Sequence, residues 1–214
     1  MQNALTIERS RSLVRRSCYA LLTAATMLVT SDMARAQDLS MPAKAAVWLS
    51  CHGVGGNSTT AANPNLAAQP KQFLVSALYV FWEGKCKNEQ MAPFASNLTN
   101  ADMNELATYF SAQLLEVPKS NPSAAQMATG KALAQQNNCV ACYAATLSGQ
   151  QHIPRLARQH FPYLKAQLVG FHVSTRYDPD GSMTSAAQAL SVQDIEVLSV
   201  YLAGLPATPA ATAK

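Results

Sequence analysis

Two stretches of this 214-residue chain carry residues that could attach and ligate a cofactor. Residues 48–52 read Trp-Leu-Ser-Cys-His, and residues 139–143 read Cys-Val-Ala-Cys-Tyr. Haem is attached covalently at the pattern Cys-x-x-Cys-His, in which both thiols bond the porphyrin and the histidine binds the iron. The first stretch lacks the first cysteine, so one attachment point and one iron ligand remain. The second stretch keeps both cysteines and lacks the histidine.

The two stretches lie at matched positions of an internal repeat. Each is followed, in the same order, by Pro-x-Leu-Ala-x-Gln, a leucine and a phenylalanine, a methionine, and a capped apolar segment. The offset between the two copies stays between 90 and 92 residues, which indicates two copies of one small fold. The matched pairs include Cys51 and Cys142, Pro64 and Pro154, Gln69 and Gln159, Phe81 and Phe171, Met91 and Met183, and Asp102 and Asp194.

The spacing of apolar residues predicts that both copies are helical. Leu74, Leu78 and Phe81 follow one face of a helix, and no stretch alternates with a period of two residues. Thr99 and Ser191 each precede an aspartate by three residues, a pattern typical of helix starts. We therefore expect an all-α fold with about three helices in each copy. Such a copy has little core for its size, and a buried cofactor would supply the missing part.

A composition change separates the two copies. Residues 116–123 read Glu-Val-Pro-Lys-Ser-Asn-Pro-Ser, which is typical of a linker. The sequence thus predicts a first domain at residues 37–115, a linker at 116–123, a second domain at 124–205 and a disordered tail at 206–214.

The first 36 residues have the parts of a secretory signal peptide. Basic residues up to Arg16 precede an apolar run at residues 18–29, and Ala34-Arg35-Ala36 offers a cleavage pattern. The run is shorter than the roughly 20 residues that cross a bilayer, so a permanent anchor is the less favoured alternative. Without this segment, 11 basic and 10 acidic residues remain, scattered along the chain. We predict a periplasmic protein that does not bind nucleic acid.

These motifs resemble those of the two-domain, dihaem class I cytochromes c of the bacterial periplasm, over residues 40–205. Proteins of that family carry Cys-x-x-Cys-His, Pro-x-Leu-Ala-Gly-Gln, a distal methionine after a loop, and a final helix in each domain. In this chain Ala68 and Arg158 replace the family's glycine. The resemblance implies two tandem cytochrome c-like domains, each a small helical bundle around a haem pocket.

The resemblance also implies which residues hold haem c. Cys51 would attach the haem of the first domain, with His52 and Met91 as the axial ligands of its iron. In the second domain, Cys139 and Cys142 would attach a haem whose iron meets Met183. Because Tyr143 replaces the histidine there, we expect one haem in the first domain and leave the second haem open. The chain has eight methionines, and the alternative for Met91 and Met183 is ordinary core packing.

Other fates of the cysteines stay open at this point. Cys139 and Cys142 could form a disulfide within their turn. A disulfide between Cys51 and Cys86 would compete with haem attachment. Tyr143 could in principle ligate iron as a tyrosinate.

The resulting hypothesis is an exported c-type cytochrome that transfers single electrons and is not itself an enzyme. Its expected partners are redox proteins, either a dehydrogenase or a terminal oxidase, and a peripheral association with the membrane is left open. The main alternative is a degenerate cytochrome without haem that serves as a structural or docking subunit of a periplasmic redox complex. A thiol oxidoreductase at Cys139 and Cys142 is less favoured, because the surrounding pattern lacks a strand-helix-strand context.

Overall fold

The computed structural model describes residues 40–116, called the first repeat below, and residues 120–206, called the second repeat. The predicted signal peptide at residues 1–36 lies outside the described residues, as does nearly all of the predicted tail. The described residues belong to a single compact unit. Every regular element in them is a helix, apart from one isolated bridge between Gln150 and Ile153, so the prediction of an all-α fold is confirmed.

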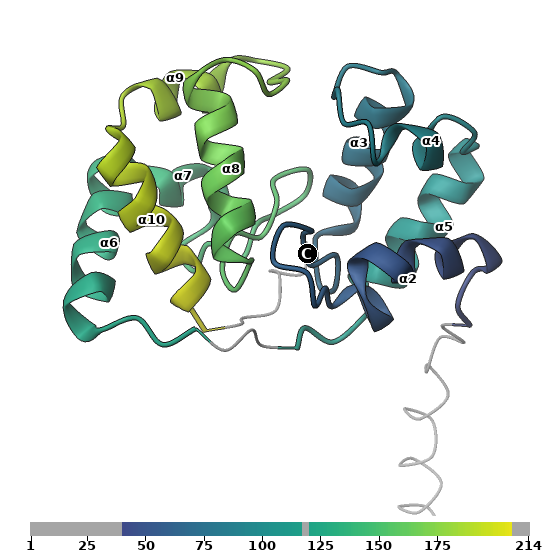
Figure 1. Ribbon diagram of the computed structural model, residues 1–214, viewed down its shortest axis with the longest axis horizontal. Coiled ribbons are helices and arrows are strands. Elements are labelled where there is room, and N and C mark those ends of the chain that lie inside the picture. The colour runs from purple at the N-terminus through teal and green to yellow at the C-terminus, as the bar shows by residue number, and fades with distance from the viewer. Residues whose placement is uncertain (1–39, 117–119, 207–214) are drawn as a thin grey trace, which may run out of the picture. The chain divides into compact units, whose positions relative to one another are not determined.

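The first repeat holds four α-helices and two short 3-10 helices (Figure 1). These are η2 (Ala43–Ala45), α2 (Ala46–His52), η3 (Val54–Gly56), α3 (Lys71–Trp82), α4 (Ala92–Ala95) and α5 (Asn100–Ser111). Helix α3 packs against α5, and α4 packs against α3. The core of this repeat gathers Trp48, Leu74, Leu78, Leu106 and Phe110 from α2, α3 and α5.

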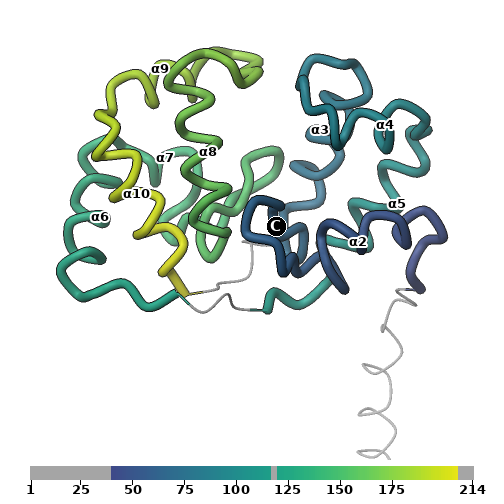
Figure 2. Tube along the Cα trace, viewed as in Figure 1, coloured from purple at the N-terminus to yellow at the C-terminus, as the bar shows by residue number. Residues whose placement is uncertain are grey.

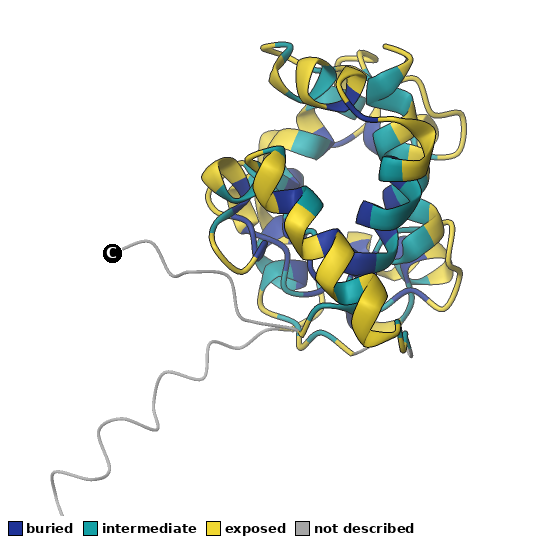
Figure 3. Cartoon of the chain, turned by 90° about the vertical axis from the view of Figure 1, so that its left-hand side faces the viewer, coloured by how far each residue is buried: buried dark blue, intermediate teal, exposed yellow. Residues whose placement is uncertain are grey.

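The second repeat holds five α-helices, which the tube in Figure 2 traces in the same chain order. They are α6 (Ala124–Gln136), α7 (Cys139–Tyr143), α8 (Phe161–His172), α9 (Ser182–Gln188) and α10 (Val192–Gly204). Helix α10 packs against both α6 and α8. Its apolar residues Ile195, Leu198 and Leu202 enter the core together with Leu164 of α8. In Figure 3 the buried residues lie mainly on the inner faces of the helices, and the exposed residues on the outer faces.

Capping residues explain where the final helix of each repeat begins. Thr99 accepts a hydrogen bond from the amide of Asp102 at 3.2 Å, and the Asp102 carboxylate accepts the amide of Thr99 at 2.8 Å. Ser191 and Asp194 form the same reciprocal pair, so both predicted helix starts are confirmed. The short helices α4 and α9 were not predicted, because each is a turn or two within a methionine loop. The helices fall on either side of residues 116–123, and the domain boundaries themselves stay a prediction.

Two residues that stand in place of the family's glycine, one in each Pro-x-Leu-Ala-x-Gln segment, lie in the left-handed region of backbone conformation. Ala68 has a φ of 53° and Arg158 a φ of 62°, a conformation that glycine adopts without strain. The amide of Ala68 donates to the carbonyl of Phe110 at 3.1 Å, and the amide of Arg158 donates to that of Leu202 at 2.9 Å. The final helix therefore anchors this segment in both repeats in the same way. Among the described residues, no helix is both long and apolar enough to pass through a membrane.

The crossing of α6 and α10 depends on a missing side chain. Gly130 is buried, and a Cβ atom at its position would overlap the Cβ of Tyr201. We expect Gly130→Ala to lower the free energy of unfolding by about 1 to 3 kcal/mol, because overpacking outweighs the better helix propensity of alanine. Urea unfolding followed by circular dichroism measures this change. Thr129→Ala, on the exposed side of α6, is the control and should stay within about 0.5 kcal/mol of the parent. Equal stabilities of the two variants would contradict the close approach.

Candidate haem site

The end of helix α2 places Cys51 and His52 side by side with different exposure. The Cys51 side chain is exposed, whereas His52 is only 5% exposed. His52 Nδ1 lies 2.9 Å from the carbonyl oxygen of Pro64. Because a carbonyl only accepts, Nδ1 carries the proton and Nε2 keeps its lone pair. Burial lowers the pKa of His52 more than this hydrogen bond raises it, which favours the neutral ring.

This arrangement of His52 is typical of a metal ligand. A ligating histidine usually donates its second ring N–H to a backbone carbonyl, which fixes the tautomer and orientation of the ring. Trp48, in the place of the missing first cysteine, is buried and stacks on His52 with ring centroids 6.0 Å apart. The tryptophan therefore fills space beside the imidazole.

The loop after α2 closes back over the end of that helix. The side-chain amide of Asn63 donates to the Cys51 carbonyl at 3.0 Å, and the hydroxyl of Ser58 donates to the same oxygen at 3.3 Å. Gly53 begins this loop with a φ of 75°, and a Cβ there would overlap the carbonyl group of Asn57. The backbone around Cys51 is thus held by the loop that also supplies Pro64.

Met91 lies at the start of α4 and is half-buried. Its backbone amide donates to the side-chain oxygen of Asn88 at 3.0 Å, which fixes the turn before the helix. The Met91 side chain packs against the same core cluster that contains Trp48. Met91 and Trp48 therefore share one core, and Trp48 in turn stacks on His52.

The matched residues of the second repeat meet each other directly. The phenol of Tyr143 donates a hydrogen bond to the sulfur of Met183, and the oxygen and sulfur lie 2.8 Å apart. Tyr143 is 8% exposed, and burial raises the pKa of its phenol. The neutral phenol is thus favoured over the tyrosinate that could ligate iron. The direct contact also leaves no space for an iron atom between Tyr143 and Met183.

All four cysteines in the described part of the chain are free thiols. Neither the disulfide between Cys139 and Cys142 nor the one between Cys51 and Cys86 is formed in the structure. Cys142 is exposed, whereas Cys139 is half-buried and burial raises the pKa of its thiol. A raised thiol pKa lowers the thiolate fraction on which disulfide exchange depends.

A network that sequence reasoning missed joins the two repeats. We call residues 64–69 and 154–159 the proline loops. The side chain of Gln159 bonds both backbone groups of Asn65, at 2.8 and 3.0 Å. The side chain of Gln69 bonds both backbone groups of Arg155, at 2.9 and 3.1 Å. The repeated Pro-x-Leu-Ala-x-Gln pattern marks both proline loops in the sequence. The pattern does not indicate that each loop forms hydrogen bonds with the other.

Arg155 adds a buried charge to this network. Its side chain is 1% exposed and donates to the carbonyl oxygens of Ala67, at 3.0 Å, and of Ala157. Burial lowers the pKa of Arg155 to about 10, so the guanidinium stays charged at neutral pH. Its Nε, and Nδ2 of the matched residue Asn65, are buried donors without a partner.

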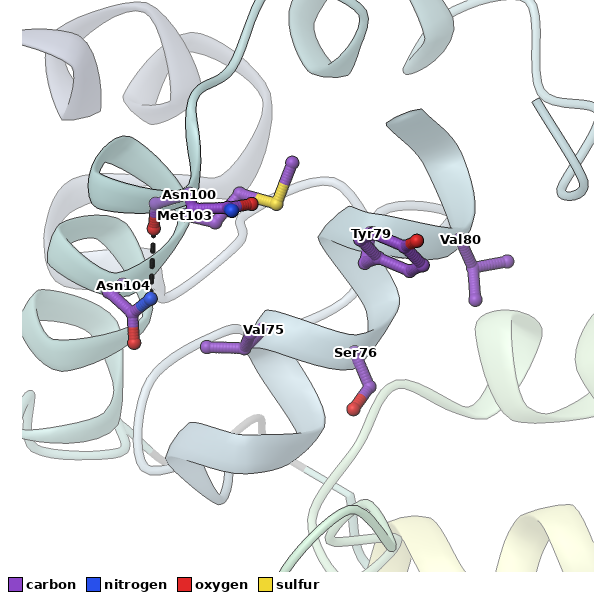
Figure 4. A pocket seen from close by; sticks show the side chains of 7 residues that line it. All are labelled: Val75, Ser76, Tyr79, Val80, Asn100, Met103 and Asn104. Carbon is purple, nitrogen blue, oxygen red and sulfur yellow. Dashed lines mark hydrogen bonds between the residues drawn. The ribbon is translucent and has the colours of Figure 1, made fainter. Parts of the chain in front are cut away.

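A separate groove of about 410 Å³ lies between α3 and α5 (Figure 4). Val75, Ser76 and Tyr79 of α3 line one side of it, and Asn100 and Met103 of α5 line the other. None of the predicted site residues borders this groove, and we assign it no function.

Comparisons with known proteins agree with the fold. Cytochrome c4 of Thiocapsa roseopersicina is 36% identical over 170 residues, which cover 74% of this chain and 87% of that protein. A Thiomonas intermedia protein named thiosulfate dehydrogenase electron acceptor is 31% identical over 183 residues, covering 80% of this chain and 84% of that protein. The crystal structure of reduced recombinant cytochrome c4 from Pseudomonas stutzeri matches with a TM-score of 0.71 and 31% identity, covering 76% and 95% of the two chains. No family model matches the sequence.

The paired helical repeats are those of a two-domain class I cytochrome c. The chain belongs to the cytochrome c4 family. This confirms the resemblance drawn from the motifs and makes the protein a cytochrome c4-like electron carrier, not an enzyme. Covalent haem c is the cofactor that the family implies, and the periplasm is its typical compartment.

The contact between Tyr143 and Met183 predicts a stability effect that depends on pH. A phenol whose pKa is raised by folding stabilises the folded state below the ordinary tyrosine pKa of about 10, and this contribution is lost as the pH rises above that value. At pH 7, Tyr143→Phe should cost about 0.5 to 1.5 kcal/mol, the usual size of one lost hydrogen bond. The difference from the parent should shrink as the pH rises past about 10.

Urea unfolding at a series of pH values measures both effects. Tyr79→Phe, which changes an exposed tyrosine, is the control and should stay within about 0.5 kcal/mol of the parent at pH 7. Parallel stability curves for Tyr143→Phe and the parent would contradict the buried, hydrogen-bonded phenol.

Proposed function

We propose that this protein carries single electrons with one haem c, bound in the first repeat by Cys51, with His52 and Met91 as the axial ligands. The observation that carries the proposal is the hydrogen bond from His52 Nδ1 to the Pro64 carbonyl, because it leaves Nε2 free in a buried, oriented ring. Cys51, exposed on the preceding position of the same helix, is available for a single thioether. When bound, the haem supplies a one-electron couple whose potential a methionine opposite histidine raises.

The residues around this site have three tasks. Cys51 holds the cofactor, and His52 and Met91 supply one nitrogen and one sulfur ligand. Trp48, which stacks on the buried ring of His52, helps to exclude water from the imidazole. Met91 is half-buried and packs against the core cluster that contains Trp48. Low solvent access and the choice of ligands are the main means by which a protein sets a haem potential.

We infer that the second repeat carries no haem. Cys139 and Cys142 would offer two attachment points, and Met183 one ligand. The 2.8 Å contact between Tyr143 and Met183 argues against the fit, because these are the two side chains that would have to face the iron from opposite sides. The buried neutral phenol is also a poor ligand. The second repeat would then serve as a structural or docking part without haem. This is the role that the alternative hypothesis of a degenerate cytochrome gave to the whole chain.

The partner of the proposed carrier is a redox enzyme of the periplasm. One relative is named for accepting electrons from thiosulfate dehydrogenase, which supports a dehydrogenase as the electron donor. Export would follow from the predicted signal peptide at residues 1–36.

Haem stoichiometry tests the proposed site. The full chain, produced in the periplasm of a host with haem-attachment machinery, should gain the mass of one haem. Cys51→Ser should lose all covalent haem, because one thioether is the only attachment. The matched double variant Cys139→Ser/Cys142→Ser should keep it. Intact mass and pyridine haemochrome spectra measure both, and haem that survives Cys51→Ser would overturn the assignment.

Tyr143→His should restore the attachment pattern of the second repeat. The imidazole replaces the phenol that bonds Met183, and Cys-x-x-Cys-His becomes complete. We expect about twice as much haem per chain as in the parent, measured by the haemochrome absorbance against protein mass. Tyr143→Phe also breaks the bond to Met183 but offers no ligand, so it is the matched control and should gain none. Two haems in the parent chain would contradict the proposal for the second repeat.

A further inference from the structure

The peptide bond between Pro64 and Asn65 is hydrogen-bonded at both ends by residues of different repeats. Its carbonyl oxygen accepts the Nδ1 proton of His52 at 2.9 Å. Its amide N–H donates to Oε1 of Gln159 at 2.8 Å. The carbonyl and the amide belong to one planar group with partial double-bond character, so they move together.

Gln159 is well placed to hold this peptide. Its side chain is only 3% exposed, and its own amide nitrogen donates to the Asn65 carbonyl at 3.0 Å. Nε2 of the neighbouring His160 lies 3.0 Å from the carbonyl oxygen of Ser58. The side-chain oxygen of Asn65 accepts a hydrogen bond from the backbone amide of Ser58 at 2.8 Å. The second repeat therefore fixes the loop that orients the histidine of the first.

The bonds form a continuous chain from the second repeat to the imidazole. A hydrogen bond accepted from a peptide N–H polarises that peptide and strengthens the bond that its carbonyl accepts. A stronger bond from His52 Nδ1 to Pro64 makes the imidazole a more basic ligand. A more basic ligand favours the ferric over the ferrous state of the iron that it binds.

From this geometry we infer that Gln159 is a positioning residue for the haem of the first repeat, acting through the peptide bond between Pro64 and Asn65 on His52. The inference rests on the proposed function, because it concerns the ligand assigned there. It gives the second repeat a task that needs no haem of its own.

Gln69 provides a matched control within the same molecule. Its side chain bonds the backbone of Arg155 in the same two ways, at 2.9 and 3.1 Å. The peptide that it holds joins Pro154 to Arg155, in the repeat where Tyr143 stands in place of the histidine. Gln69→Ala and Gln159→Ala thus remove the same groups and the same number of bonds between the repeats. Only Gln159→Ala breaks a chain that ends on an iron ligand.

The test compares haem-loaded full-length variants by redox titration and by the absorption band of methionine-ligated ferric haem. Gln159→Ala should raise the reduction potential and shift the ferric-ferrous equilibrium about threefold toward ferrous, a change of the size of one weakened hydrogen bond. Gln69→Ala should leave the potential unchanged. Gln159→Glu, which keeps an acceptor for the Asn65 amide and gives it a negative charge, should lower the potential below the parent value.

Each outcome bears on a different conclusion. Equal potential shifts in the two alanine variants, or no shift in either, would overturn the role of Gln159 while leaving the haem site intact. A parent chain without haem on Cys51 would instead overturn the proposed function, and it would be seen before any variant is compared. If Gln159→Ala does not accumulate, the glutamate variants of both residues replace the alanine variants in the test. Gln159→Glu should lower the reduction potential, and Gln69→Glu should leave it unchanged. Equal reduction potentials of these two variants would refute the inference.

Discussion

Backbone groups that become buried must find hydrogen-bond partners, and the two proline loops meet this requirement through each other. Leaving such a group unpaired costs about 1 to 3 kcal/mol, so the four bonds made by Gln69 and Gln159 matter more for what they prevent than for their net strength. The pairing is reciprocal, like the self-complementary interface of a symmetric dimer, although both partners belong to one chain. The proline loops of the first and second repeats are thereby fixed together.

The two repeats fill the same kind of core in two ways. In the first, His52 donates to the backbone carbonyl of Pro64 and keeps one ring nitrogen free. In the second, the longer Tyr143 reaches Met183 and uses up both side chains. Protein interiors are densely packed, so a second repeat without haem, as proposed, needs side chains to fill the space that a haem would take. A tyrosine bonded to a polarisable sulfur is one such filling.

The helices and their starts could be predicted because their determinants are local. The reciprocal bonds of Thr99 with Asp102 span three residues, and the apolar faces of α3 and α10 follow from helical spacing alone. The repeat offset also paired His52 with Tyr143 and Met91 with Met183. The contacts of Tyr143 with Met183 and of Gln159 with Asn65 could not be predicted, since they join residues 40 and 94 positions apart. Such contacts depend on the packing of whole helices, which no single motif specifies.

The left-handed conformation of Ala68 and Arg158 shows which part of the molecule dictates the shape of the proline loops. A residue other than glycine in that conformation costs roughly 1 to 2 kcal/mol, yet both loops keep it. The final helices, through the carbonyls of Phe110 and Leu202, hold the loops more strongly than the local residue resists. These turns therefore keep one backbone conformation although the residue at this position differs between them. The second repeat therefore keeps the same loop conformation as the first, although Tyr143 stands at the position matched to His52.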